Sequence, residues 1–308
     1  MGKMEFFKSP LETGYAQLST RFDAEYGILW GMMKPEGVPC CNLNLLSELQ
    51  QYHQSIENCG GTIQISGKQH SMRYVVLASK VPGVFNLGGD LTLISQLIKS
   101  RDRQGLMHYA TMSINSMMPR INHYGLPVTT IALIQGDAFG GGLEAALTSD
   151  IVIAERNCRM GFPEILFNLI PGHGAYSLVS RKIGVARAEK MILSGNLYRA
   201  EELHEFGLVD VLAGDGEGEE AVYDYVKKQS RRSNGVMALH KARQRFNPVT
   251  YQEMMDITTI WVDAALQLGE SDLKVIGRFM RSQQKIYEKD KPVQYASQME
   301  REMNLAVL

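Results

Sequence analysis

Short apolar runs alternate with helical patterns in this chain of 308 residues, and this alternation limits the possible folds more than any other feature. Apolar runs bounded by turn residues are expected to form strands at residues 26–33, 62–65, 74–78, 131–135 and 151–154. Helical periodicity lies between several of them, at residues 43–55, from 91 or 103 to 123, at 185–193 and at 200–206. Strands that alternate with helices are typical of a parallel or mixed sheet covered by helices, so an α/β fold is predicted.

A glycine-rich segment at residues 214–218 has the composition of a linker, and the pattern beyond it is helical throughout. Thr250 and Glu253 have the spacing of a capping box, and Gly269 is expected to end the helix that they begin. We therefore expect a core domain over residues 1–212 and a C-terminal helical region over residues 213–308. An amphipathic tail of this kind typically packs on its own domain or on a neighbouring subunit.

The charge and residue composition disfavour several classes of function. With 32 basic and 33 acidic residues the net charge is −1, which disfavours nucleic acid and anionic membranes as partners. A polar start and the absence of long apolar stretches predict a cytoplasmic protein. The four cysteines show no CxxC spacing and the seven histidines form no HxxxH or HExxH pair, so free thiols and no metal site are expected.

A glycine-rich turn over residues 139–144, Phe-Gly-Gly-Gly-Leu-Glu, lies where an apolar run passes into a helical pattern. Glycine permits close approach of another molecule, and the first N–H groups of a helix have no partner within the helix. The turn can therefore hold a developing negative charge, with the Glu144 carboxyl group beside it. Alone, the same pattern also fits a plain tight connection in which the helix dipole favours a glutamate.

Two further segments could complete a catalytic site around this turn. Gly88 and Gly89 follow the strand at 74–78, so a second backbone N–H could converge on the same oxygen, as an enolate or tetrahedral intermediate requires. Glu164 follows Glu144 by 20 positions, beyond the strand at 151–154, and could face it across one cleft. Two facing carboxyl groups can divide acid and base roles, although Glu164 alone would fit a solvated helix start.

Several motifs occur together in one order: FNLGGDL at 85–91, IQGDAFGGGLEAALTSDIVIAE at 134–155, MGFPEILFNLIPGHGA at 160–175 and SGNLYRAEELHEFGLVDVL at 194–212. The set resembles the crotonase (enoyl-CoA hydratase/isomerase) superfamily over roughly residues 26–212, and several ordered motifs are more specific than any one. The resemblance implies a spiral of ββα units followed by a C-terminal helical region.

The resemblance also implies roles for individual residues. Gly89 and Gly141 would donate N–H groups to a thioester carbonyl, and the backbone of Leu87 and Gly88 would contact the carrier of the acyl group. Hydratases of this superfamily use two glutamates, whose positions Glu144 and Glu164 occupy here. Both together favour the addition or removal of water, with Glu164 expected to handle the α-proton and Glu144 the β-oxygen or the water. No cofactor is expected.

Three departures from the hydratases point to a closer resemblance. Leu87 replaces a small residue, residues 172–178 replace a GGTQRL-like stretch, and the tail at 278–283 lacks the KRxP-like segment that helps to hold CoA. With the late Ile-Trp-Val-Asp at 260–263, these features resemble the diffusible signal factor (DSF) synthases of Gram-negative bacteria. The likeness puts an acyl carrier protein rather than CoA forward as the carrier.

The closer resemblance implies a hydro-lyase that also has thioesterase activity. Such enzymes dehydrate a 3-hydroxyacyl carrier protein to a cis-2-enoyl thioester and hydrolyse it, which releases a fatty-acid signal for quorum sensing. An acyl tunnel is implied, to which we assign Leu143, Phe162 and Trp261, although ordinary core packing fits them equally. A loop histidine with no visible partner favours a structural role for His173.

The resemblance implies partners as well, and other functions stay open. The C-terminal region would complete the acyl pocket and the contacts of a homo-oligomer, a trimer or a hexamer, and a sensor kinase is a possible partner. One alternative is an enoyl-CoA hydratase of fatty-acid metabolism that acts on a CoA thioester. Another is a regulatory binding protein that keeps the fold without catalysis.

Overall fold

The computed structural model describes residues 9–11 and 13–287, whose largest sheet has six strands. The first pair of strands is antiparallel, and the others run parallel. Their order across the sheet is β1 (Leu18–Asp23), β2 (Ile28–Met33), β5 (Tyr74–Ser79), β7 (Thr129–Ile134), β9 (Ile151–Glu155) and β12 (Val211–Ala213). The predicted strand runs at 26–33, 74–78, 131–135 and 151–154 correspond to the central strands β2, β5, β7 and β9.

A second sheet of four strands lies beside the first, with the order β11 (Leu197–Arg199), β10 (Arg159–Gly161), β8 (Gly136–Phe139) and β6 (Gly83–Asn86). Successive units each pass through one strand of the large sheet and one of the small sheet and then enter a helix. This is the spiral of ββα units that the crotonase resemblance implies, so the predicted α/β fold class is confirmed. The predicted run at 62–65 forms β3 (Thr62–Ile65), which pairs only with β4 (Lys68–Ser71).

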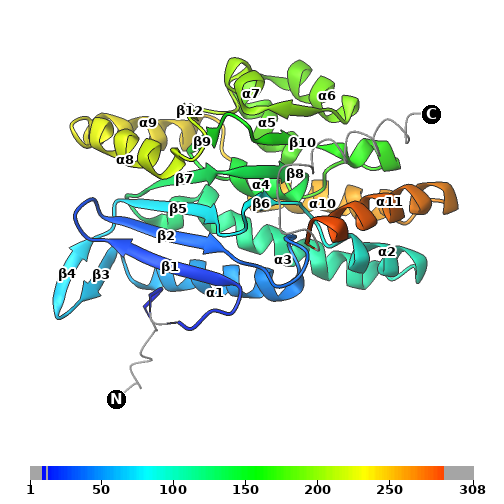
Figure 1. Ribbon diagram of the computed structural model, residues 1–308, viewed down its shortest axis with the longest axis horizontal. Helices are drawn as coiled ribbons and strands as arrows, with labels where there is room; N and C mark the ends of the chain where they lie inside the picture. The colour runs from blue at the N-terminus through cyan, green and yellow to red at the C-terminus, as the bar shows by residue number, and fades with distance from the viewer. Residues whose placement is uncertain (1–8, 12, 288–308) are drawn as a thin grey trace.

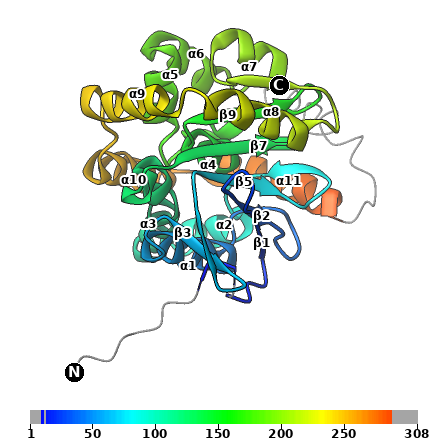
Figure 2. The same cartoon turned by 90° about the vertical axis from the view of Figure 1, so that its left-hand side faces the viewer.

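Helices cover both faces of the large sheet, and the alternation of side chains along β2 shows how. Leu29 and Met33 face the core shared with α1 (Leu43–Asn58), whereas Ile28, Trp30 and Met32 face the core shared with α8 (Gly218–Ser230). Strands buried on both faces have continuous apolar sequences, which is why these runs were visible in the sequence. Figures 1 and 2 show α1 and α8 on opposite sides of this sheet.

Other helices connect the strands or pack around them. They are α2 (Leu91–Lys99), α3 (Arg103–Ile121), α4 (Gly141–Leu147), α5 (Ala175–Ile183), α6 (Val185–Ser194) and α7 (Ala200–Phe206), with two 3-10 turns, η1 (His123–Gly125) and η2 (Pro163–Phe167). Helices begin at both predicted starts, residues 91 and 103, because residues 100–102 separate α2 from α3. Arg101 there has φ 52°, and the Asp102 side chain accepts the Gly105 N–H at 2.8 Å and so caps α3.

The region after the glycine-rich segment is helical as predicted, with α8, α9 (Ser233–Phe246), α10 (Tyr251–Ala265) and α11 (Glu270–Tyr287). The predicted boundary at residue 212 falls within β12, and residues 288–308 lie outside the described residues. Thr250 caps α10, but the helix ends at Ala265 rather than Gly269. Gly269 precedes α11 instead, with its N–H donating to Asp272. No helix among the described residues has the length and apolar composition needed to cross a bilayer.

Helix α4 packs so tightly against β6 that one position excludes any side chain. An ideal Cβ atom on Gly142 would overlap the carbonyl oxygen of Asn86, whereas one on Gly235 in α9 would meet no atom within 4 Å. We expect Gly142→Ala to lower the free energy of unfolding by about 1–3 kcal/mol, because backbone atoms must move apart. Gly235→Ala is the matched control and should raise it by up to about 1 kcal/mol. Chemical denaturation of both variants measures the difference, and equal effects would contradict this packing argument.

Candidate active site

The candidate site lies where the parallel strands of the small sheet end. Asn86 of β6 is opposite Ala138 of β8, and Phe139 of β8 is opposite Gly161 of β10. The turns that follow these strands are therefore neighbours, and they carry the predicted residues at 87–89, 140–144 and 162–164. Ligands commonly bind at the carboxyl ends of parallel strands, where such turns meet.

The first two turns bring their backbone N–H groups together. Gly88 has φ +91°, and an ideal Cβ atom on it would lie only 2.7 Å from the Phe139 carbonyl oxygen and 3.1 Å from the Gly141 nitrogen. The N–H groups of Gly89 and Gly141 find no acceptor among the described residues. Two unpaired donors in adjacent turns can stabilise a negative oxygen, as the sequence predicted.

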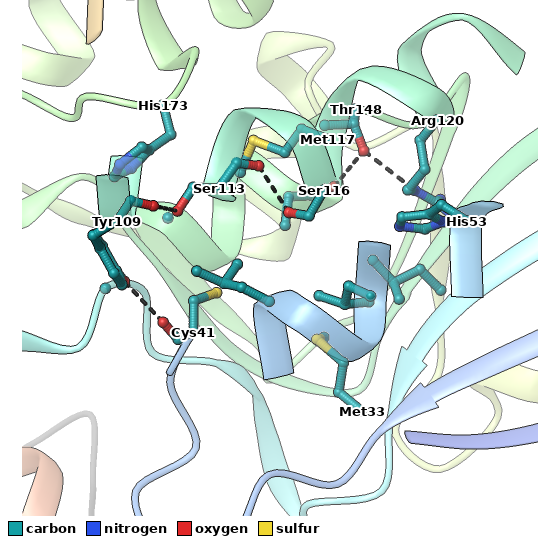
Figure 3. Close-up of a pocket in the computed structure, with 16 residues that line it drawn as sticks. Met33, Cys41, His53, Tyr109, Ser113, Ser116, Met117, Arg120, Thr148 and His173 are labelled. Carbon is teal, nitrogen blue, oxygen red and sulfur yellow. Dashed lines mark hydrogen bonds between the residues drawn. The ribbon is translucent and has the colours of Figure 1, made fainter. Parts of the chain in front are cut away.

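Hydrogen bonds with neighbouring residues fix the turn at residues 87–89, and Figure 3 shows one bond of this network, between Tyr109 and Cys41. The Gly88 N–H donates to the Asn86 side-chain oxygen at 2.8 Å, and the Gly88 carbonyl accepts the Cys41 N–H at 2.8 Å. The buried Tyr109 hydroxyl donates to the Cys41 carbonyl at 2.8 Å and accepts the Asp90 N–H at 3.0 Å. The turn is thus held in place before any ligand binds, which lowers the cost of reorganisation.

Glu144 lies in the first turn of α4 and is 1% exposed. One carboxylate oxygen accepts the N–H groups of His173 and Ala175, each at 2.8 Å. These two donors stabilise the negative charge of the side chain. The other oxygen is buried and has no hydrogen-bond partner in the part of the chain that the structure describes, which is unusual for a carboxyl group and leaves it available to a ligand.

Glu164 lies in η2, and it also has one buried carboxyl oxygen without a hydrogen-bond partner. An ideal Cβ atom on Gly140 would overlap its carboxyl group, so the glycine makes room for this side chain. Burial, and then the negative charge of Glu144, raise the pKa of Glu164 to about 8. Near neutral pH the two carboxyl groups therefore share one proton, as an acid and base pair requires.

His173, which the sequence suggested to be structural, lies against this pair. Its backbone supports Glu144, and its Nδ1 atom is 3.6 Å from the free oxygen of that carboxylate. Its ring packs beside Trp261, with a centroid separation of 5.2 Å, and its buried Nε2 atom has no partner. The glycines on either side of His173 in the sequence are the signal that could have linked this backbone to the site.

A cavity with about 50 Å³ of free space joins these groups. Of the residues assigned to the substrate, Leu87, Gly88 and Trp261 line this cavity, whereas Leu143 and Phe162 lie in the hydrophobic core. The sequence analysis assigned no role in the site to several other lining residues, among them Phe167, Leu169, Ile276, Phe279 and Gln283. Three of these come from α11, so the predicted C-terminal region does contribute to the pocket.

Gln283 of α11 binds a backbone carbonyl group that, according to the resemblance, would contact the carrier of the acyl group. Its side-chain amide donates to the carbonyl oxygen of Leu87 at 3.1 Å. A carrier that contacts this carbonyl would have to displace Gln283. Helix α11 therefore contacts the first turn of the site through the Gln283 amide.

A narrower cavity extends inward from Gly89, Gly141 and His173, with about 20 Å³ of free space. Figure 3 shows its walls between α1, α3 and α4. Leucine and methionine side chains, including Met33 and Met117, line its middle. Its far end is polar, since Arg120 and His53 lie there and the Arg120 Nε atom donates to Thr148 at 3.2 Å. Flexible methionines allow such a space to widen around an apolar chain.

Comparisons with known proteins agree with this architecture. The model of the enoyl-CoA hydratase/isomerase family matches residues 49–256. A probable mitochondrial enoyl-CoA hydratase 2 of Arabidopsis thaliana is 31% identical over 203 residues, which cover 66% of this chain and 61% of that protein. The chain thus spans less than two thirds of the length of the first curated relatives that it matches.

Solved structures share the fold at low sequence identity. An enoyl-CoA hydratase from Bacillus halodurans has a TM-score of 0.71 and 20% identity, over 85% of this chain and 98% of that chain. Pseudomonas aeruginosa DspI has a TM-score of 0.63 and 22% identity, over 91% of this chain and 97% of that chain. At these identities the likeness concerns the fold alone.

Proposed function

Because this chain belongs to the enoyl-CoA hydratase/isomerase family, we propose that it removes water from a 3-hydroxyacyl thioester and then hydrolyses the thioester. The product would be a cis-2-unsaturated fatty acid that serves as a quorum-sensing signal. The observation that carries the proposal is the pair of buried carboxyl groups, Glu144 and Glu164, each with an unpartnered oxygen beside two unpaired N–H groups.

In the first step the thioester carbonyl oxygen accepts the N–H groups of Gly89 and Gly141. The reaction starts when the shared proton lies on Glu144 rather than on Glu164, where the raised pKa otherwise keeps it. Ionised Glu164 then removes the α-proton, and these N–H groups hold the enolate charge. Protonated Glu144 donates its proton to the β-hydroxyl group, which leaves as water. Glu164 now carries the α-proton and Glu144 is ionised, so the pair still holds one proton in total.

This distribution of the proton suits the second step. Ionised Glu144 takes a proton from a water that attacks the thioester carbon, and the same N–H groups hold the tetrahedral oxyanion. The bond between carbon and sulfur breaks, and protonated Glu164 supplies the proton to the leaving thiolate. The pair returns to its starting state, so one pair of glutamates serves both steps without an added reagent.

We further propose an acyl carrier protein as the carrier. Gln283 holds the Leu87 carbonyl that would otherwise contact the carrier, and the departures of Leu87 and of residues 278–283 from the hydratases support the same choice. The acyl chain would extend from Gly141 into the narrower cavity, where Met33 and Met117 can move apart.

The carrier and the product are tested together in vitro. Purified protein is incubated with 3-hydroxydodecanoyl carrier protein, with the matching CoA ester, and with short trans-2-enoyl-CoA. We expect free cis-2-dodecenoic acid by mass spectrometry, formed faster from the carrier protein, and none from a Glu144→Gln control. Bound, unhydrolysed thioester would remove the thioesterase step, and efficient hydration of trans-2-enoyl-CoA alone would favour the enoyl-CoA hydratase alternative.

We also propose that the chain is cytoplasmic and acts as a homo-oligomer, a trimer or a hexamer. Large apolar side chains are exposed on several helices, with Leu193 at 64%, Ile260 at 60% and Phe246 at 89%, and contacts between copies would cover them. A sensor kinase remains a proposed partner. Signal output that persists in a Glu144→Ala, Glu164→Ala double variant would favour the non-catalytic, regulatory alternative.

A further inference from the structure

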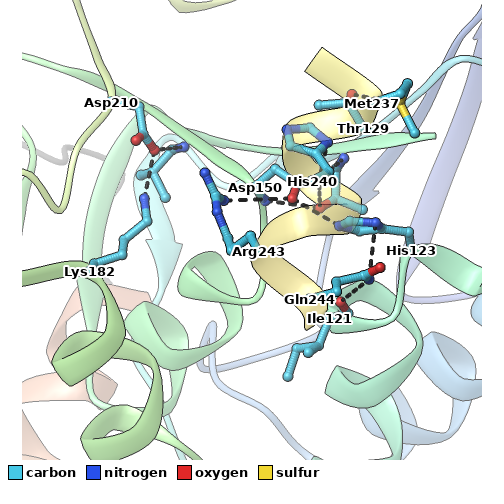
Figure 4. Close-up of polar contacts among 12 residues, drawn as sticks. Ile121, His123, Thr129, Asp150, Lys182, Asp210, Met237, His240, Arg243 and Gln244 are labelled. Carbon is cyan, nitrogen blue, oxygen red and sulfur yellow. Dashed lines mark hydrogen bonds and ion pairs between the residues drawn. The ribbon is translucent and has the colours of Figure 1, made fainter. Parts of the chain in front are cut away.

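Three potential metal ligands meet outside the pocket that Glu144 and Glu164 line, in the wall of another cavity of about 610 Å³. His123 follows α3, Asp150 precedes β9, and His240 lies in the middle of α9. Figure 4 shows their side chains pointing toward one another. The sequence predicted no metal site because its histidines lack a ligand spacing, and only the fold brings these segments together.

The distances suit a small coordination sphere. The His123 Nε2 atom is 2.9 Å from one oxygen of Asp150, and the His240 Nδ1 atom is 3.7 Å from the other. One ligand atom of each residue lies within 4.8 Å of the other two. Ligands about 2.0–2.2 Å from a tetrahedral zinc ion are about 3.3–3.6 Å apart, so small movements of the two histidines would bring one atom of each residue to that spacing.

His240 is the observation that points to a missing ligand. It is 3% exposed and is the one buried residue of α9, but its Nδ1 atom has no hydrogen-bond partner within residues 9–11 and 13–287. A buried polar atom without a partner destabilises the folded chain, because it has lost its hydrogen bonds to water. The rest of α9 is poorly anchored, since Leu239 and Phe246 are exposed, so a bond from His240 to an ion would add a strong attachment.

The surrounding groups hold the ligands in position. Asp150 accepts the backbone N–H of Thr130 at 2.9 Å and its hydroxyl at 3.0 Å. The Gln244 Nε2 atom lies 3.2 Å from the His123 Nδ1 atom. Rotation of this amide by half a turn places its oxygen there, where it accepts the Nδ1 N–H when the histidine Nε2 atom binds a metal. Arg243 competes for Asp150 from 3.9 Å, but its side chain is 53% exposed and can turn to solvent at little cost.

We propose that His123, Asp150 and His240 bind one divalent transition-metal ion such as Zn²⁺, and that this ion fastens α9 to the sheet. Two imidazole nitrogens and one carboxylate favour such an ion over Mg²⁺ or Ca²⁺, which prefer oxygen ligands. The adjoining cavity leaves room for water as the fourth ligand. The proposal concerns structure and does not depend on the reaction proposed above.

The test uses the full chain after removal of metals with a chelator. Isothermal titration calorimetry with Zn²⁺ should show one binding site per chain. Co²⁺ should give the visible absorption spectrum of a four-coordinate ion. Addition of Zn²⁺ should also raise the melting temperature of the protein. His240→Ala and the milder His240→Gln should weaken Zn²⁺ binding by at least about tenfold and abolish the thermal shift. His108→Ala removes an exposed histidine and should bind as the wild type does.

Two results would overturn the proposal. One is a wild-type chain that binds no Zn²⁺ and shows no thermal shift. The other is Zn²⁺ binding that both His240 variants retain at the wild-type affinity, since the ion would then lie elsewhere. If His240→Ala does not fold, His240→Gln together with the Co²⁺ spectrum of the wild type still decides the question.

Discussion

Replacing Glu164 by glutamine is expected to lower turnover about 10²–10⁴-fold and, above pH 8, to raise the melting temperature. The loss of turnover follows because glutamine cannot take up or release the proton that the proposed reaction moves. The gain in stability follows because the raised pKa of Glu164, about 8, reports a cost of ionising this buried group. Steady-state kinetics and thermal unfolding of the same preparations measure both effects.

The sign and the pH range of the stability effect can be worked out. Below pH 4.5 the carboxyl group is protonated in the folded and the unfolded chain, so ionisation contributes no difference. Between 4.5 and about 8 the unfolded chain loses this proton while the folded chain keeps it, so stability falls as the pH rises. Above about 8 the destabilisation is complete, and the advantage of glutamine is largest.

Glu253 provides a control of opposite sign. Burial alone would raise its pKa, but the hydrogen bonds and the charge of Arg181 hold the pKa below its ordinary value. Glu253→Gln should therefore lower the melting temperature at pH 8 and leave turnover nearly unchanged. A Glu164→Gln variant that is both active and no more stable than the wild type would contradict the assigned role of this residue.

The strands that the sequence predicted and the strands that it missed differ in length and in residue composition. Strands β5, β7 and β9 are buried on both faces, so their apolar runs were visible in the sequence. Strands β8 and β10 have three or four residues each, and they include Gly136, Asp137 and Gly161, which are not typical of strands. Motif order identified the residues of the turns, but the short strands that align these turns could not be predicted.

The substrate pocket was harder to predict than the carboxyl pair. Leu143 was assigned to it through the resemblance to the DSF synthases. Consecutive residues of a helix point in different directions, and Leu143 faces the core whereas Glu144 faces the pocket. Ile276 and Phe279 do line the pocket, yet their spacing in α11 equally fits ordinary core packing. His173 acts partly through its backbone N–H, and the identity of a side chain does not reveal such a role; only the flanking glycines indicate it.

The pH dependence of catalysis provides the second test with a large effect. The reactive form of the pair carries one proton in both directions of the dehydration, because one glutamate takes a proton from the substrate while the other gives one to it. The forward and reverse reactions must therefore lose activity together when the pair loses its last proton. We expect kcat/KM to fall about tenfold per pH unit above the pKa of about 8.

Measurements of kcat/KM from pH 6 to 10 in both directions would test this expectation. Unfolding at each pH serves as the control, because loss of structure would also lower the rate. A fall in only one direction would mean that the two glutamates do not exchange a single proton, and a flat profile would mean that Glu164 need not be protonated at any stage. Coincident falls centred near pH 8 would instead tie the burial of Glu164, and the charge of Glu144 beside it, to the chemistry of the thioester.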